Sequence, residues 1–77
     1  MFITLTIEAS GEKVDIRIDS EQKISEVFRI LQESGQLAKG RLPNYFRSHI
    51  KQTLVSAFKT FDEESIFDGD ILTAIYE

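Results

Sequence analysis

The sequence predicts an α+β fold with one amphipathic helix packed beside a sheet, and three patterns lead to this prediction. Residues 2–8 and 13–18 alternate apolar and polar side chains with a period of two, which is typical of half-buried strands. Residues 24–31 carry apolar side chains at spacings of three and four, which is typical of a helix with one buried face. Residues 71–76 are apolar almost throughout, as expected of a strand with neighbours on both sides.

The first two strands are expected to form a hairpin. Between them lies the short segment Ala9-Ser10-Gly11-Glu12, which carries the glycine that a tight reversal favours. The side chains expected to face the core are Ile3, Leu5, Ile7, Val14, Ile16 and Ile18.

A helix of about a dozen residues is expected next, close to the average length of globular helices. Asp19 or Ser20 is suited to cap its start, and Gly35 is placed to end it in the left-handed conformation. Its apolar stripe consists of Ile24, Val27, Phe28 and Leu31. Residues 36–43 are expected to form a loop, which Gly40 and Pro43 indicate.

The pattern of residues 44–61 fits two structures. Apolar residues at spacings of three and four favour a second helix, which Pro43 is suited to start. The many aromatic and β-branched residues favour a hairpin instead, with Lys51-Gln52 as its turn. The residues themselves leave this choice open.

The last third of the chain carries clear turn signals. Thr60 and Glu63 form a capping-box pattern, which predicts a single helical turn ending near Ser65. Asp68-Gly69-Asp70 predicts a tight turn before the final strand, with Gly69 free to adopt a positive φ.

Length and composition exclude several classes of protein. With 77 residues the chain is expected to form one domain, residues 1–77, too small for a two-domain enzyme. Thirteen acidic against nine basic residues give a net charge of −4, and the basic residues are scattered, so nucleic-acid binding is not expected. The chain has no cysteine, no long apolar run and no signal-peptide pattern, so a cytoplasmic protein without membrane insertion is expected.

No catalytic, cofactor-binding or metal site is expected. His49 is the one histidine, and a strand would point it and the adjacent Ser48 to opposite faces, which argues against a serine–histidine pair. The acidic residues from Asp62 to Asp70 do not have the spacing of a calcium-binding loop, and aspartates are common in turns for conformational reasons.

The order of these elements resembles that of ubiquitin, and the resemblance extends to short motifs. The segment 60–72 looks like the corresponding segment and closing strand of ubiquitin. It is also similar to the small ubiquitin-like proteins of Gram-positive type VII secretion systems, the YukD/EsaB family. Ile66, Gly69-Asp70 and Leu72 match one motif of that family, and Arg47 and Val55-Ser56 match two others.

The resemblance covers nearly the whole chain and has consequences for the fold. It implies a β-grasp, ubiquitin-like domain with a mixed sheet of four to five strands and one main helix. It favours strands at Tyr45–Ile50 and Leu54–Ser56 around a turn at Lys51-Gln52-Thr53. The expected core is Ile3, Leu5, Ile7, Val14, Ile16, Ile18, Ile24, Val27, Leu31, Phe61, Ile66, Leu72 and Ala74.

The resemblance also implies a function, that of a non-catalytic protein-interaction module. The chain is then a cytoplasmic accessory or regulatory component of a type VII secretion system. Its partner is a cytoplasmic segment of a membrane-bound component of that system. The alternative is a protein modifier or sulfur carrier, which reacts through a flexible C-terminal Gly-Gly; the sequence ends instead at Tyr76-Glu77, which disfavours this alternative.

The candidate interaction site lies on the final strand and its neighbour. If Leu72, Ala74 and Tyr76 face the core, the alternate residues of that strand face outward. In the ubiquitin-like register, two residues of the neighbouring strand share this outer face. The candidate site therefore consists of Arg47, His49, Ile71, Thr73 and Ile75.

Overall fold

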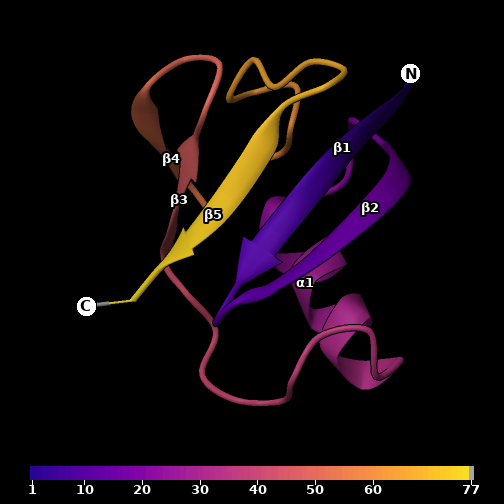
Figure 1. Cartoon of the computed structure of the whole chain (residues 1–77). Helices are drawn as coiled ribbons and strands as arrows, with labels where there is room; N and C mark the ends of the chain where they lie inside the picture. The colour runs from indigo at the N-terminus through magenta and orange to yellow at the C-terminus, as the bar shows by residue number, and fades with distance from the viewer. Residues whose placement is uncertain (77) are drawn as a thin grey trace.

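The computed structural model describes residues 1–76 and shows a five-stranded sheet with one helix on one of its faces (Figure 1). Glu77, on which the expected lack of a C-terminal tail partly rests, lies outside the described residues. The elements are β1 (Phe2–Ala9), β2 (Glu12–Asp19), α1 (Ile24–Glu33), β3 (Tyr45–Ser48), β4 (Thr53–Ser56) and β5 (Ile71–Ile75).

The strands are ordered β2-β1-β5-β3-β4 across the sheet. β5 pairs in parallel with β1 and antiparallel with β3, while each of the two hairpins is antiparallel. The sheet is therefore mixed, and the predicted α+β, β-grasp fold is confirmed. β5 is the central strand, as its nearly continuous apolar sequence predicted.

The predicted hairpin of β1 and β2 is present, and in its register Leu5 lies opposite Ile16. Its turn residues Ser10 and Gly11 have φ values of 51° and 81°, the positive values that a two-residue type I′ turn requires. The prediction that Val14, Ile16 and Ile18 belong to the buried core is only partly correct, because these three side chains are half-buried. β2 is the last strand of the sheet and has a neighbour on one side alone, so its inner face is incompletely covered.

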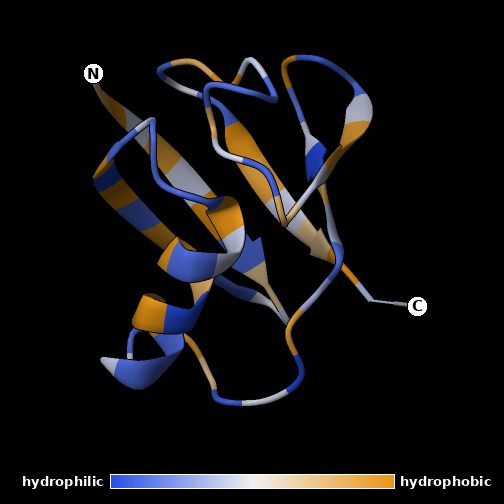
Figure 2. Ribbon diagram, turned by 180° about the vertical axis from the view of Figure 1, so that it is seen from behind, coloured by the Kyte–Doolittle hydropathy of each residue, from blue (hydrophilic) through white to orange (hydrophobic). Residues whose placement is uncertain are grey.

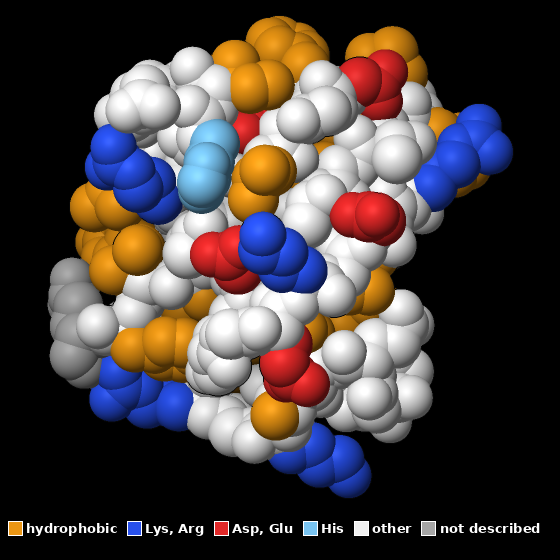
Figure 3. Space-filling model, in the orientation of Figure 1, with side chains coloured by type: hydrophobic (Ala, Val, Ile, Leu, Met, Phe, Trp, Pro, Cys, Tyr) orange, Lys and Arg blue, Asp and Glu red, His pale blue; other side chains and the backbone are white. Residues whose placement is uncertain are grey.

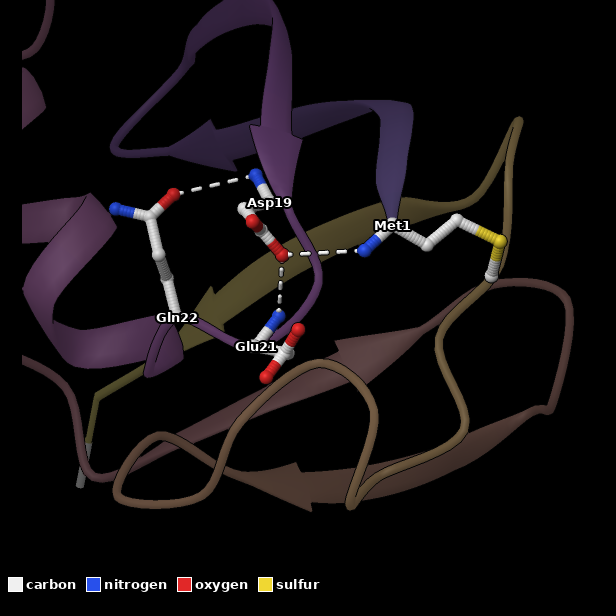
Figure 4. Close-up of polar contacts among 4 residues, drawn as sticks. All are labelled: Met1, Asp19, Glu21 and Gln22. Carbon is white, nitrogen blue, oxygen red and sulfur yellow. Dashed lines mark hydrogen bonds and ion pairs between the residues drawn. The ribbon is translucent and has the colours of Figure 1, made fainter.

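Helix α1 does not start with the predicted cap. Lys23 occupies the capping position and makes no side-chain hydrogen bond there. The Asp19 carboxylate instead accepts hydrogen bonds from the Glu21 N–H and the Met1 amino group (Figure 4), and Ser20 is buried.

The first N–H groups of α1 are satisfied by a distant segment. The N–H of Ser25 donates to the Ala57 carbonyl at 2.8 Å, and that of Ile24 donates to the Lys59 carbonyl at 3.1 Å. A tertiary contact therefore satisfies the free donors that a local side-chain cap would otherwise take.

The end of α1 follows the prediction. Gly35 has a φ of 83°, its N–H donates to the Gln32 carbonyl, and the Gln36 N–H donates to the Leu31 carbonyl. This pair of hydrogen bonds is the Schellman arrangement, for which glycine is the favoured residue because it lacks Cβ.

The ambiguous stretch forms a hairpin, so the helical interpretation of residues 44–61 is wrong. Phe46 and Val55 lie opposite each other and point inward, and both are buried. β3 ends at Ser48, two residues before the predicted end, and Ile50 is an exposed turn residue. Sheet pairing and burial of Phe46 therefore outweigh the helical spacing of the apolar residues.

The core lies between the sheet and α1 (Figure 2). Phe28, Phe46 and Phe61 are its largest side chains, and the rings of Phe28 and Phe46 meet edge to face with centroids 5.4 Å apart. The predicted core omitted the buried residues Ala9, Phe28, Leu37, Phe46, Val55 and Ala57.

Two residues expected in the core near the end of β5 are not fully buried. Ala74 is half-buried against the core, and Tyr76 lies beyond the strand and is exposed. The guanidinium of Arg41 lies over the Tyr76 ring at 5.6 Å. The expected alternation fails at Tyr76 because β5 ends at Ile75.

The predicted capping box is present before β5. The Thr60 N–H donates to Glu63 Oε1 at 2.9 Å, and the Glu63 N–H donates to Thr60 Oγ1 at 3.0 Å. The chain then makes one hydrogen-bonded turn that ends at Ser65, which has a φ of 55°. The Thr60 N–H holds the pKa of Glu63 below its ordinary value.

We expect stability to depend on the ionisation of Glu63. Because the folded state lowers the pKa of this carboxylate, its contribution is present above the ordinary glutamate pKa and is lost as the pH falls through the folded value. Glu63→Gln should therefore flatten part of the decline in the free energy of unfolding between roughly pH 5 and pH 3. Urea denaturation across that range measures it, and identical pH profiles would contradict the expectation.

Leu5→Ala should reduce the free energy of unfolding by about 2–5 kcal/mol, because it leaves a cavity in the small core. Thr4→Ala is the matched control, since Thr4 points to the opposite, exposed face of β1. The control should change stability by less than about 1 kcal/mol. Equal shifts of the two denaturation midpoints would contradict the assignment of the faces of β1.

Candidate functional site

The face of the sheet opposite α1 carries a set of outward side chains from three neighbouring strands, which we call the outer face. Figure 3 views the molecule from this side, with the histidine beside basic and hydrophobic side chains. The outer face consists of Tyr45, Arg47, His49, Leu54, Ile71, Thr73 and Ile75.

The structure brings the five predicted site residues together on this face. Arg47 lies directly opposite Thr73 in the antiparallel pair of β3 and β5. His49 follows β3, and its Nε2 lies 3.0 Å from Thr73 Oγ1. Ile71 and Ile75 precede and follow Thr73 at alternate positions of β5, so both share its face.

The β3–β4 turn contacts two polar residues of the outer face, Arg47 and His49. Arg47 Nη2 donates to Gln52 Oε1 at 3.3 Å, and Gln52 Nε2 donates to the His49 carbonyl at 2.9 Å. Gln52 adopts a positive φ of 58°, which closes the turn. Both side chains are exposed, yet Gln52 holds the Arg47 guanidinium and Thr73 Oγ1 contacts the His49 imidazole, which reduces their freedom before any partner binds.

Two apolar members of the outer face were missed from the sequence. Tyr45 lies opposite Ile75, and Leu54 lies opposite Arg47. Their side chains are 40% and 51% exposed, whereas Ile75 is half-buried. Alternation with the buried Phe46 and Val55 was the signal that places them outward, but it requires knowing that the stretch is a hairpin.

A shallow pocket of about 350 Å³ adjoins Ile75 at the end of the outer face. The loop before β3 forms its other walls through Arg41, Leu42, Pro43 and Asn44. The apolar part of the outer face therefore continues into a hollow beside β5.

A buried carboxylate supports the turn that carries His49. Asp70 is 2% exposed, and its Oδ1 accepts hydrogen bonds from the N–H groups of Ile50 at 3.1 Å and Ile71 at 2.7 Å. Its Oδ2 accepts a hydrogen bond from the Ser48 hydroxyl, which in turn accepts one from the Lys51 N–H. Asp70 thus links the start of β5 to the β3–β4 turn.

Replacing Asp70 by alanine should leave the Ser48 hydroxyl and two partly buried N–H groups, those of Ile50 and Ile71, without their acceptor. We expect a loss of about 2–4 kcal/mol in the free energy of unfolding, since hydrogen bonds to charged groups are stronger than neutral ones. The backbone amide signals of residues 49–52 should broaden or shift in NMR spectra. Unchanged stability and unchanged turn signals would show that Asp70 does not hold this turn.

The described residues offer no catalytic arrangement around His49. The Ser48 hydroxyl is buried and donates to Asp70, while His49 lies exposed on the opposite face. Within residues 1–76, no group of three His, Asp or Glu side chains is placed to hold a metal ion. None of the described helices is long and apolar enough to cross a membrane.

The fold of this chain is ubiquitin-like, as its similarity to solved structures shows. A de novo designed protein based on ubiquitin is similar, with a TM-score of 0.70 and 14% sequence identity. The match covers 96% of this chain and 87% of the designed chain. The ubiquitin of Caldiarchaeum subterraneum matches with a TM-score of 0.60 and 13% identity, covering 100% of this chain and 98% of its own.

Two further solved structures are similar to the whole of this chain. A chain in the structure of protomer 1 of the ESX-3 core complex matches all of this chain, with a TM-score of 0.62 and 20% identity. This chain spans 17% of the length of that one. The EccD5 ubiquitin-like domain of Mycobacterium xenopi matches over 100% of this chain and 98% of its own, with a TM-score of 0.52 and 13% identity. No protein-family model and no curated protein matches the sequence.

Proposed function

We propose that this chain is a non-catalytic protein-interaction module, and that it acts as a cytoplasmic accessory or regulatory component of a type VII secretion system. Its partner is a cytoplasmic segment of a membrane-bound component of that system, bound through the outer face. The observation that carries the proposal is the convergence of three strands on one preorganised surface of apolar and polar groups.

The chemistry of the outer face suits a protein partner. Tyr45, Leu54 and Ile75 supply apolar area at positions that the core does not require. Arg47 offers a planar guanidinium with several donors, and tyrosine and arginine are common among the residues that dominate binding energy. An apolar centre with polar groups beside it is the usual composition of a protein–protein interface.

The assignment to a secretion system rests on two supports. The motifs at Ile66, Gly69-Asp70 and Arg47 resemble those of the YukD/EsaB family. The structural neighbours independently include a chain of the ESX-3 core complex and the EccD5 domain. In the proposal, the chain adds its outer face to such a complex at the cytoplasmic side.

The proposal is tested by capture of partners from native cytoplasm and membranes, identification by mass spectrometry, and titration of the captured segment. Ile75→Asp places a charge in the apolar area, opposite Tyr45, and should weaken binding at least tenfold, about 1.4 kcal/mol. Circular dichroism must first show that the variant is folded.

The matched control is Phe58→Asp. Phe58 is also an exposed apolar residue, but it lies between Ala57 and Lys59, whose carbonyls contact the start of α1, and it is not part of the outer face. This variant should bind as the wild type does. Equal binding by folded Ile75→Asp would exclude the outer face, and a captured partner with no link to a secretion membrane complex would overturn the assigned system.

A further inference from the structure

β2 is an edge strand of the sheet, so one row of its backbone N–H and C=O groups has no neighbouring strand. Along a strand, alternate residues direct both N–H and C=O to opposite sides. Ser20, which follows β2, donates its N–H to the Met1 carbonyl at 2.8 Å, so the even-numbered residues of β2 face β1. The N–H and C=O groups of Lys13, Asp15 and Arg17 therefore point away from the sheet.

The open row ends at Asp19. The Asp19 N–H donates to Gln22 Oε1 at 3.2 Å (Figure 4). The Asp19 carbonyl accepts from the Gln22 N–H at 3.0 Å. The start of α1 thus covers the last edge position of β2. Lys13, Asp15 and Arg17 remain as a short pairing edge.

Two of the devices that usually prevent edge pairing, a bulge and a proline, are absent from β2, although its outward side chains are charged. The eight residues of β2 pair one to one with β1, so no bulge twists the edge away, and the segment contains no proline. Its inward side chains are apolar and half-buried. An open groove of about 380 Å³ runs beside them against α1, with Ile16, Ile18, Val27, Ile30 and Leu31 in its lining.

The order of charges along β2 is complementary to itself, which favours a second copy of this chain as the partner. When two copies of β2 are placed antiparallel with Ile16 facing Ile16, Asp15 of each copy lies opposite Arg17 of the other, and Lys13 lies opposite Asp19. Val14 then faces Ile18 on the inner side. Each directly opposed pair is either oppositely charged or apolar, the combinations that stabilise neighbouring strands.

Neighbouring registers lack this complementarity. With Asp15 on the axis, two aspartates face each other and Lys13 opposes Arg17. With Arg17 on the axis, two arginines meet and Asp15 opposes Asp19. Like charges directly opposite destabilise a strand pair, so among these three registers the charge pattern favours the one centred on Ile16.

Within residues 1–76, the central charges Asp15 and Arg17 have no ion-pair partner. Asp15 accepts a hydrogen bond from the Thr6 hydroxyl at 2.6 Å, and the Arg17 guanidinium lies over the Phe2 ring at 4.9 Å. Among residues 1–76, neither side chain is in an ion pair, whereas Lys13 and Asp19 are. A second copy would supply Asp15 and Arg17 with their missing partners.

We propose that this chain self-associates into a two-fold symmetric dimer through antiparallel pairing of β2 with β2 of a second copy, centred on Ile16. In this dimer Asp15 and Arg17 exchange backbone hydrogen bonds and form two symmetric charge pairs. The axis is perpendicular to the sheet, so both copies join in one continuous sheet and both outer faces point to the same side. The groove of each copy, with its apolar residues Ile16, Ile18, Val27, Ile30 and Leu31, lies beside the inner residues of the other.

Sedimentation velocity over a concentration series tests the dimer. The wild-type mass should rise toward twice the 8.8 kDa of the chain. Asp15→Lys and Arg17→Glu each oppose like charges in the dimer, so each should raise the concentration of half-association at least tenfold. A wild type that stays monomeric up to about 1 mM, or single variants that associate as the wild type does, would overturn the proposal.

Mixing the two variants provides a direct test of the register. In a mixed pair, Lys at position 15 meets Glu at position 17, and Arg17 meets Asp15, so all four charges are complementary. The equimolar mixture and the double variant Asp15→Lys/Arg17→Glu should both regain association. If neither regains it, the pairing of Asp15 with Arg17 is wrong.

Amide hydrogen exchange supplies a measurement independent of charge. The N–H groups of Asp15 and Arg17 should become protected as the concentration rises, whereas that of Ile16, bonded to β1, should be protected throughout. Ile75→Asp should dimerise as the wild type does, and Asp15→Lys should still bind the partner of the outer face as a monomer. Failure of the dimer and failure of the proposed function are therefore distinguishable.

Discussion

The structure depends on the insertion of β5 between β1 and β3. This strand joins two hairpins that are otherwise separate, and it does so through a parallel ladder on one side and an antiparallel ladder on the other. Its Leu72 is completely buried at the centre of the core. A hairpin alone is marginally stable in water, so each half of the sheet requires the central strand.

The segment just before β5 makes this insertion specific. Asp68 accepts a hydrogen bond from the Thr4 N–H, and the Gly69 N–H donates to the Thr4 carbonyl, which positions the segment against β1. Asp70 then accepts from the turn that follows β3. Three successive residues thus connect both neighbours of β5, and a buried charge is acceptable at Asp70 because its two oxygens are hydrogen-bonded.

The same arrangement separates the surfaces used in the two proposals. The inner side of the sheet is occupied by α1, so binding groups gather on the outer side, over β3, β4 and β5. β5 is the central strand, and β1 lies between it and β2. The unpaired edge of β2 is therefore separated from the outer face by β1. Partner binding and self-association therefore do not compete for the same residues.

Local sequence determined the elements whose signals are local. The alternation of Ile3, Leu5 and Ile7 is sufficient for a half-buried strand, Gly35 is sufficient to end α1, and Thr60 and Glu63 cap their turn without outside help. Tertiary structure decided the features that depend on distant residues. The start of α1 is satisfied by the carbonyls of Ala57 and Lys59, and the outward direction of Tyr45 and Leu54 follows from the pairing of β3 with β5. Hydrogen bonds and burial between segments far apart in the chain leave no local pattern. The apolar residues beside Arg47, His49 and Ile75 were therefore missed. Those three were proposed from the ubiquitin-like register and from the alternation of the final strand.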